Sequence, residues 1–75
     1  MTIIEAMNSA ARSHGVDFQA LLGPARHSEL VAARWEGWAN AHAAGHAFAA
    51  IARATGRDHT SVMHGVRRYN ERNET

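Results

Sequence analysis

Residues 47–69 read AFAAIARATGRDHTSVMHGVRRY, and two helical patterns meet here with almost nothing between them. Apolar residues at the 3.6-residue period predict one helix over 47–55 that ends at Gly56, and a second over 58–72. The expected inward positions are Phe48, Ile51, Ala52 and Thr55 in the first helix and Val62, Val66 and Tyr69 in the second. Only Gly-Arg-Asp separates the helices, which is helix-turn-helix spacing, although such pairs also occur in proteins that never touch DNA.

Two further helical segments are expected near the N-terminus. Thr2 is a good cap for a helix over 3–14, and Gly15 suits its left-handed end. The apolar positions of this helix are Ile3, Ile4, Met7, Ala10 and Ala11. Asp17 caps a short segment over 18–22, which stops at the Gly-Pro pair that follows. This segment packs Phe18, Leu21 and Leu22.

A longer helix is expected in the middle of the chain, with Ser28 as its N-cap and its end near Gly45. Val31, Trp35, Trp38 and His42 form its stripe. No segment alternates with a period of two, so no sheet is expected, and the polar tail 70–75 is expected to fray. The sequence therefore predicts an all-α fold of about four to five helices.

Size and composition limit the possible functions. The 75 residues, 45% of them hydrophobic, suffice for one compact domain over 1–75 and leave little room for a deep catalytic cleft. There is no Cys to form a disulfide or a cysteine zinc site. With no basic leader and no run of about 18 apolar residues, we expect a soluble, cytoplasmic protein that is not an enzyme, needs no cofactor and does not associate with a membrane.

The net charge says little, but its distribution is uneven. All eight basic residues are Arg, and seven acids leave a formal charge of +1. Residues 1–25 hold Arg12 against Glu5 and Asp17, whereas residues 26–75 hold the other seven Arg against five acids. Arginine suits bidentate contacts to phosphates and bases.

The polar residues that open the last helix precede its first buried position, Val62, so their side chains are expected to be free of the core. These residues are Asp58, His59, Thr60 and Ser61. Such side chains at a helix start can bond to base edges or phosphates in a DNA major groove. The alternative is that Asp58 or Thr60 is only a helix cap and that His59 is a solvated surface residue.

The stretch GRDHTSVMHGVRR, residues 56–68, resembles the G-R-D-H-T-T-V-x-H-A signature of the C-terminal DNA-binding domain of the bacterial replication initiator DnaA. LLGPAR at 21–26 and AR at 33–34 resemble the family's L-L-x-x-x-R loop and the start of its long helix. FAAIARATG at 48–56 resembles the helix before the signature. The resemblance implies a small Trp-repressor-like helix-turn-helix domain that binds double-stranded DNA.

The resemblance also assigns roles to individual residues. The residues that it implies for base reading in the major groove are Asp58, His59 and Thr60. Ser61 takes the place of a phosphate-contacting Thr, and Arg26 matches an arginine that enters the adjacent minor groove. Arg34 and, less securely, His42 match positions that contact the DNA backbone.

The outer stripe of the last helix continues the proposed contact surface. His64, Arg68 and Arg72 follow Ser61 along it, either beside a phosphate backbone or as a solvated face. Arg57 and Arg67 are weaker candidates.

Trp35 stands where the family has Gln, and its role is open. A phosphate contact is lost there, or the ring packs against the loop. The indole is otherwise a core residue or an exposed anchor for a protein partner.

Two chemical alternatives are weaker. His42 and His46 are four residues apart, like helical zinc ligands, but no third ligand is near them in the sequence. A catalytic set of Asp58, His59 and Ser61 is disfavoured because neighbours on one helical turn diverge.

No G-x-x-x-x-G-K-[ST] loop is present, so the chain lacks the ATPase motor of the initiator. We therefore expect a sequence-specific binder of double-stranded DNA, most simply a transcriptional regulator associated with the nucleoid. Alternatives are a replication-origin binder that competes with the initiator, and a small helical protein-interaction adaptor. Expected partners besides DNA are a second DNA-binding protein, RNA polymerase or a homodimer mate, since one small module gives modest affinity.

Overall fold

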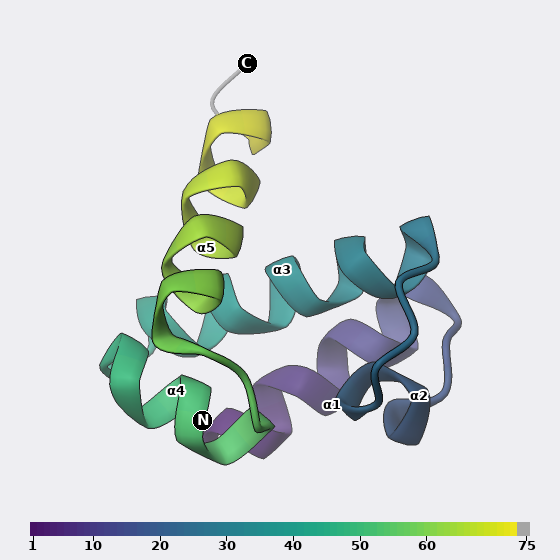
Figure 1. Ribbon diagram of the computed structural model, residues 1–75, viewed down its shortest axis with the longest axis horizontal. Coiled ribbons are helices and arrows are strands. Elements are labelled where there is room, and N and C mark those ends of the chain that lie inside the picture. Colours follow the sequence, from purple (N-terminus) through teal and green to yellow (C-terminus); the bar gives the residue numbers. More distant parts are fainter. Residues whose placement is uncertain (74–75) are drawn as a thin grey trace.

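The computed structural model describes residues 1–73, which form five helices and no strand (Figure 1). The helices are α1 (Ile3–His14), α2 (Phe18–Leu22), α3 (Ser28–Ala43), α4 (Phe48–Thr55) and α5 (His59–Asn73). The predicted all-α class is confirmed. α1 and α3 pack along each other, α4 lies below the start of α5, and α5 rises steeply out of this layer (Figure 1).

Local chemistry fixes most helix ends where the sequence predicts them. The Thr2 hydroxyl accepts a hydrogen bond from the Glu5 amide at 3.0 Å, and Glu5 accepts one from the Thr2 amide at 2.6 Å. Asp17 caps α2 by accepting from the Ala20 amide at 3.2 Å. Gly15 and Gly56 end α1 and α4 with φ values of 65° and 66°, which are strained for residues with a Cβ.

The predicted cap of α3 is wrong by one residue. His27, with φ −62° and ψ 147°, is the N-cap and makes no side-chain capping bond, whereas Ser28 is already helical. An N-cap needs non-helical backbone angles, and the extended loop after Pro24 ends at His27. α3 closes at Ala44, and Gly45, with φ 107°, turns the chain toward α4.

The core lies where α1, α3, α4 and α5 meet. Its largest fully buried side chains are Met7, Leu21, Ile51 and Val62. The prediction that Ile4 faces inward is wrong, because 43% of Ile4 is exposed and Ala6 takes the inward position. His42, predicted on the stripe of α3, is likewise exposed, whereas Trp38 is buried.

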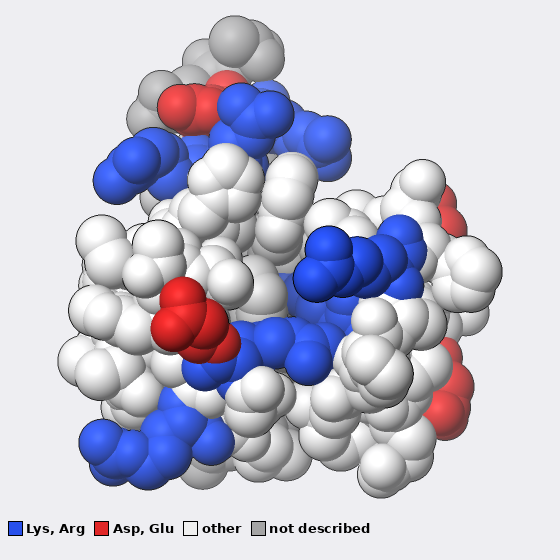
Figure 2. Space-filling view, viewed as in Figure 1, with Lys and Arg blue, Asp and Glu red and all other residues white. Residues whose placement is uncertain are grey.

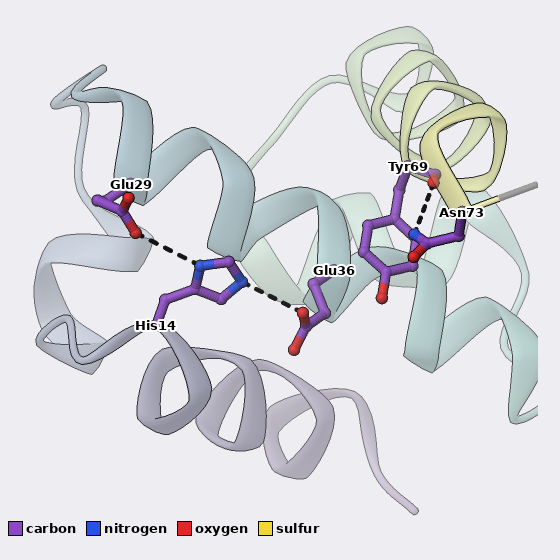
Figure 3. A network of polar contacts seen from close by, with 5 residues as sticks. All are labelled: His14, Glu29, Glu36, Tyr69 and Asn73. Atoms are coloured by element: carbon purple, nitrogen blue, oxygen red, sulfur yellow. Dashed lines mark hydrogen bonds and ion pairs between the residues drawn. The ribbon is translucent and has the colours of Figure 1, made fainter. Parts of the chain in front are cut away.

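A histidine joins α1 to α3. Nε2 of His14 lies 3.2 Å from Glu36 Oε1, and Nδ1 lies 3.5 Å from Glu29 Oε2 (Figure 3). The same view shows Asn73 Nδ2 donating to the Tyr69 carbonyl at 2.9 Å. The tail predicted to fray is thus helical as far as Asn73, and the rest of that prediction lies outside the described residues.

The helix-turn-helix consists of α4, a three-residue turn and α5. The Arg57 amide donates to the Ala52 carbonyl at 2.9 Å, and the buried Thr55 hydroxyl donates to the Ile51 carbonyl at 2.8 Å. These bonds close the C-terminal end of α4, where the turn begins. Within residues 1–73, no helix has the length and apolarity to cross a membrane.

Candidate nucleic-acid interface

The first turn of α5 is polar and faces away from the core. Asp58, His59, Thr60 and Ser61 are exposed, and Val62 is the first fully buried residue. The Val62 amide donates to the Asp58 carbonyl at 3.2 Å, so the helical hydrogen bonds start at Asp58. Within residues 1–73 the side chains of Asp58 and Thr60 form no hydrogen bond, so neither is occupied as a helix cap.

A surface groove of about 630 Å³, here called the central groove, separates this turn from the loop between α2 and α3. It brings together eight of the residues predicted from the sequence: Arg26, Arg34, Trp35, Arg57, Asp58, Thr60, Ser61 and His64. The loop before α3, α3 itself and the start of α5, which is distant from both in the chain, therefore share one concave surface.

Three predicted site residues lie outside the groove lining. His42 stacks on Phe48, with ring centroids 4.0 Å apart, and the His59 ring lies 6.3 Å from the same ring. Arg68 forms an exposed ion pair with Glu71 at 3.8 Å. The structure places these residues around the helix-turn-helix but not against the loop.

Arg34 is buried, with 6% of its surface exposed. Its Nε donates to the Leu21 carbonyl at 2.7 Å, and its Nη2 donates to the carbonyls of Gly23 at 2.8 Å and Ala20 at 3.2 Å. These bonds fasten the end of α2 to α3 and so hold the loop that carries Arg26. Nε and Nη2 of Arg34 thus donate to carbonyls of the protein itself. A contact between Arg34 and a DNA backbone stays a prediction.

Arg57 reaches the same loop from the helix-turn-helix. Its Nη2 donates to the Gly23 carbonyl, which therefore accepts hydrogen bonds from two guanidinium groups. The sequence could not reveal the Gly23 carbonyl as a shared acceptor, because every residue has a backbone carbonyl and the residue type does not show which one is used. The Gly-Pro pair marked only a loop.

The lining of the groove carries three arginines and one carboxylate, that of Asp58. Burial, followed by the charges of Arg57 and Arg26, lowers the pKa of Arg34 below its ordinary value. Within residues 1–73 no carboxylate forms an ion pair with any of these three arginines. Figure 2 shows basic side chains over this loop, the α4–α5 turn and the far end of α5, with an acidic group among them. Such a surface attracts an anion.

Trp35 forms one wall of the groove and is half-buried. The His64 ring meets it edge-on at 6.2 Å, and the Arg72 guanidinium carbon lies 5.1 Å from the centre of its ring. Both partners are on α5. The indole of Trp35 therefore packs from α3 against α5, at the edge of the hydrophobic core.

His42 and His46, the pair considered as zinc ligands, both contact backbone carbonyls. His42 Nδ1 lies 3.0 Å from the His46 carbonyl, and His46 Nε2 lies 2.9 Å from the Met1 carbonyl. Over residues 1–73, no three side chains of His, Asp or Glu are grouped as metal ligands would be.

The order of these elements, with an arginine loop before the long helix and a polar turn opening the last one, agrees with a comparison against protein families. Residues 3–68 match the family described as the bacterial dnaA protein helix-turn-helix. The chain belongs to this family. Membership in the dnaA helix-turn-helix family implies binding to double-stranded DNA. Searches of curated proteins and of solved structures give no match to this chain.

Proposed function

We propose that the protein is a sequence-specific regulator of transcription that reads duplex DNA with the first turn of α5 and with Arg26. The observation that carries this proposal is the central groove, which places an exposed polar helix start opposite an exposed arginine, across a surface whose arginines form no ion pair within residues 1–73. A helix start fits a major groove, and a guanidinium fits a narrow A·T-rich minor groove.

The groove between the two reading elements suits the phosphate backbone that separates a major groove from the next minor groove. Arg57 and Ser61 line it, and the Arg34 charge lies behind them. Anionic phosphate would offset the mutual repulsion of the arginines. These contacts would set the position of the protein on the duplex, while Asp58, His59 and Thr60 would distinguish bases.

Binding at promoters would control transcription, and binding at an origin would compete with an initiator. The adaptor alternative depends on a free Trp35 surface, but Trp35 is half-buried and engaged by His64 and Arg72. DNA binding is therefore the better supported function.

Selection of bound molecules from random duplexes tests the proposal. We expect one enriched motif with an A·T-rich stretch beside it, and anisotropy titrations that show at least about a thousandfold preference over unrelated duplexes. Equal affinity for all duplexes would contradict sequence-specific reading. Mapping of occupied loci in cells then separates promoters from origins.

A further inference from the structure

Gly65 occupies a position in α5 that helix propensity does not favour. A glycine inside a helix weakens it relative to alanine, because glycine loses more backbone freedom on folding. Its backbone angles do not require glycine, since the glycines with positive φ are Gly15, Gly45 and Gly56. The reason lies in what Gly65 touches.

Gly65 lies directly against two indole rings of α3. A Cβ atom on Gly65 would lie 2.6 Å from Cδ1 of Trp35, 2.6 Å from Cε3 of Trp38 and 2.7 Å from Cζ3 of Trp38. Carbon atoms in contact are normally about 3.5–4.0 Å apart, so an added methyl group would force a displacement of about 1 Å. Trp38 is 4% exposed and cannot yield into solvent.

The same Trp35 ring is held by α5 on either side of Gly65. His64 meets its edge, and Arg72 lies over the ring two turns later. The first turn of α5 is anchored by Val62, which is fully buried in the core. α5 stands steeply on α3 (Figure 1), so a helix held at its first turn and pushed away from α3 near its middle would change its tilt.

We infer that the contact of Gly65 with Trp35 and Trp38 is a positioning device that sets the tilt of α5 and so determines which DNA spacing the protein accepts. The inference rests on the proposed function. The tilt fixes how Thr60 and Ser61 point relative to Arg26 across the central groove. A recognition site tolerates errors of only about 0.5 Å, so a displacement of about 1 Å alters the match to the duplex.

The test compares Gly65→Ala with Gly37→Ala. Gly37 is also buried in a helix, and a Cβ there would lie 2.6 Å from Sδ and 3.3 Å from Cα of the buried Met7. Gly37→Ala therefore imposes a comparable clash on the α1–α3 contact, which does not line the central groove. Both variants are titrated with the selected duplex and with duplexes that have one base pair added or removed between the motif and its A·T-rich flank. Spin labels on cysteines introduced at Ala25 and Asn70, both exposed in a chain without native Cys, report the tilt without DNA.

We expect Gly65→Ala to remain helical and to change the distance between the two spin labels. Its affinity for the selected duplex should fall about tenfold, which is the effect of one mismatched base pair. Its order of preference among the duplexes of different spacing should also change. Gly37→Ala should keep the label distance and the ranking. A folded Gly65→Ala variant that keeps both would overturn the inference. If no duplex is selected by the natural sequence, the proposed function fails, while the label distance still decides whether Gly65 sets the tilt.

Should circular dichroism show that Gly65→Ala does not fold, Trp35→Phe replaces it. The smaller ring lets α5 settle closer to α3, so the label distance and the spacing preference should again change. An unchanged distance and ranking in that variant would refute the positioning role.

Discussion

Burial gives two arginines of the same loop region different roles. Arg26 is exposed at the groove rim, whereas Arg34, eight positions later, is enclosed and bonded to three backbone carbonyls. One is available to a ligand, and the other maintains the shape of the loop. Their family positions had suggested a DNA contact for both, because a sequence does not show which guanidinium a neighbouring segment will cover.

Replacing Arg34 should destabilise the fold. Arg34→Ala leaves the carbonyls of Leu21 and Gly23 short of donors, and we expect the free energy of unfolding to fall by about 1–3 kcal/mol. Arg34→Lys should rescue little, because an ammonium group lacks the planar fork that reaches several acceptors. Urea denaturation measures the change, and Arg53→Ala, at an exposed position, is the matched control. Equal stability of the two alanine variants would refute the structural role.

Thr60 lines the groove and should read one base pair. We expect Thr60→Ala to weaken binding to the selected duplex by about 1–3 kcal/mol and to relax the preference at a single position. Anisotropy titrations on single-base variants of the site measure both effects. Asn8→Ala, exposed on α1, serves as the control. The assignment would be lost if Thr60→Ala bound every site variant with unchanged affinity.

At the scale of elements, the helix ends could be predicted where the deciding residues are local. Gly15 and Gly56 adopt the left-handed conformation that their sequence positions indicated. The start of α3 could not be placed to the residue, because the loop after Pro24 sets the backbone angles of His27. The fit of Gly65 against Trp35 and Trp38 was also beyond prediction, since the contact joins residues about 30 positions apart.

The capping box of α1 predicts a specific pH dependence. Hydrogen bonds from the backbone and side chain of Thr2 lower the pKa of Glu5. A lowered pKa in the folded state means that the stabilisation is present above the ordinary Glu pKa and is lost as the pH falls through the lowered value. The carboxyl resonance of Glu5, followed by NMR against pH, should therefore titrate below that of an unstructured Glu.

Thr2→Ala separates the contribution of the Thr2 hydroxyl to the lowered pKa of Glu5 from that of the Thr2 backbone N–H. It removes the hydroxyl but keeps the backbone N–H, so the pKa of Glu5 should move toward its ordinary value and the protein should lose about 1 kcal/mol of stability. Thr2→Ser keeps the hydroxyl and is the matched control. If the two variants titrate alike, the hydroxyl has no part in the shift.

For the whole molecule, the placement of charge matters more than its sum. The formal net charge is only +1, yet basic side chains gather over the groove and along α5 (Figure 2). Each phosphate neutralised contributes about −0.9 to the slope of log affinity against log salt, so contacts by Arg26, Arg57 and Arg68 predict a slope of about −3. Titrations between low and physiological salt measure it.

Matched variants identify the arginines behind that slope. Arg57→Ala should reduce its magnitude by about one unit, whereas Arg12→Ala, on α1 and outside the groove lining, should leave it unchanged. A slope near zero for the natural sequence would contradict a phosphate-binding surface. The sequence had indicated the excess of arginine from residue 26 onward, but only the fold brings Arg34 and Arg57 to one carbonyl, that of Gly23, and places Arg26 on the same groove.

The most direct measurement is methylation interference on the selected duplex, which marks guanine N7 in the major groove and adenine N3 in the minor groove. We predict interference at N7 within the motif and at N3 in the adjoining A·T-rich stretch, with the N3 signal lost in Arg26→Ala and the N7 signal retained. Interference confined to one groove, or an N3 signal that persists in Arg26→Ala, would contradict reading by α5 and Arg26 in neighbouring grooves.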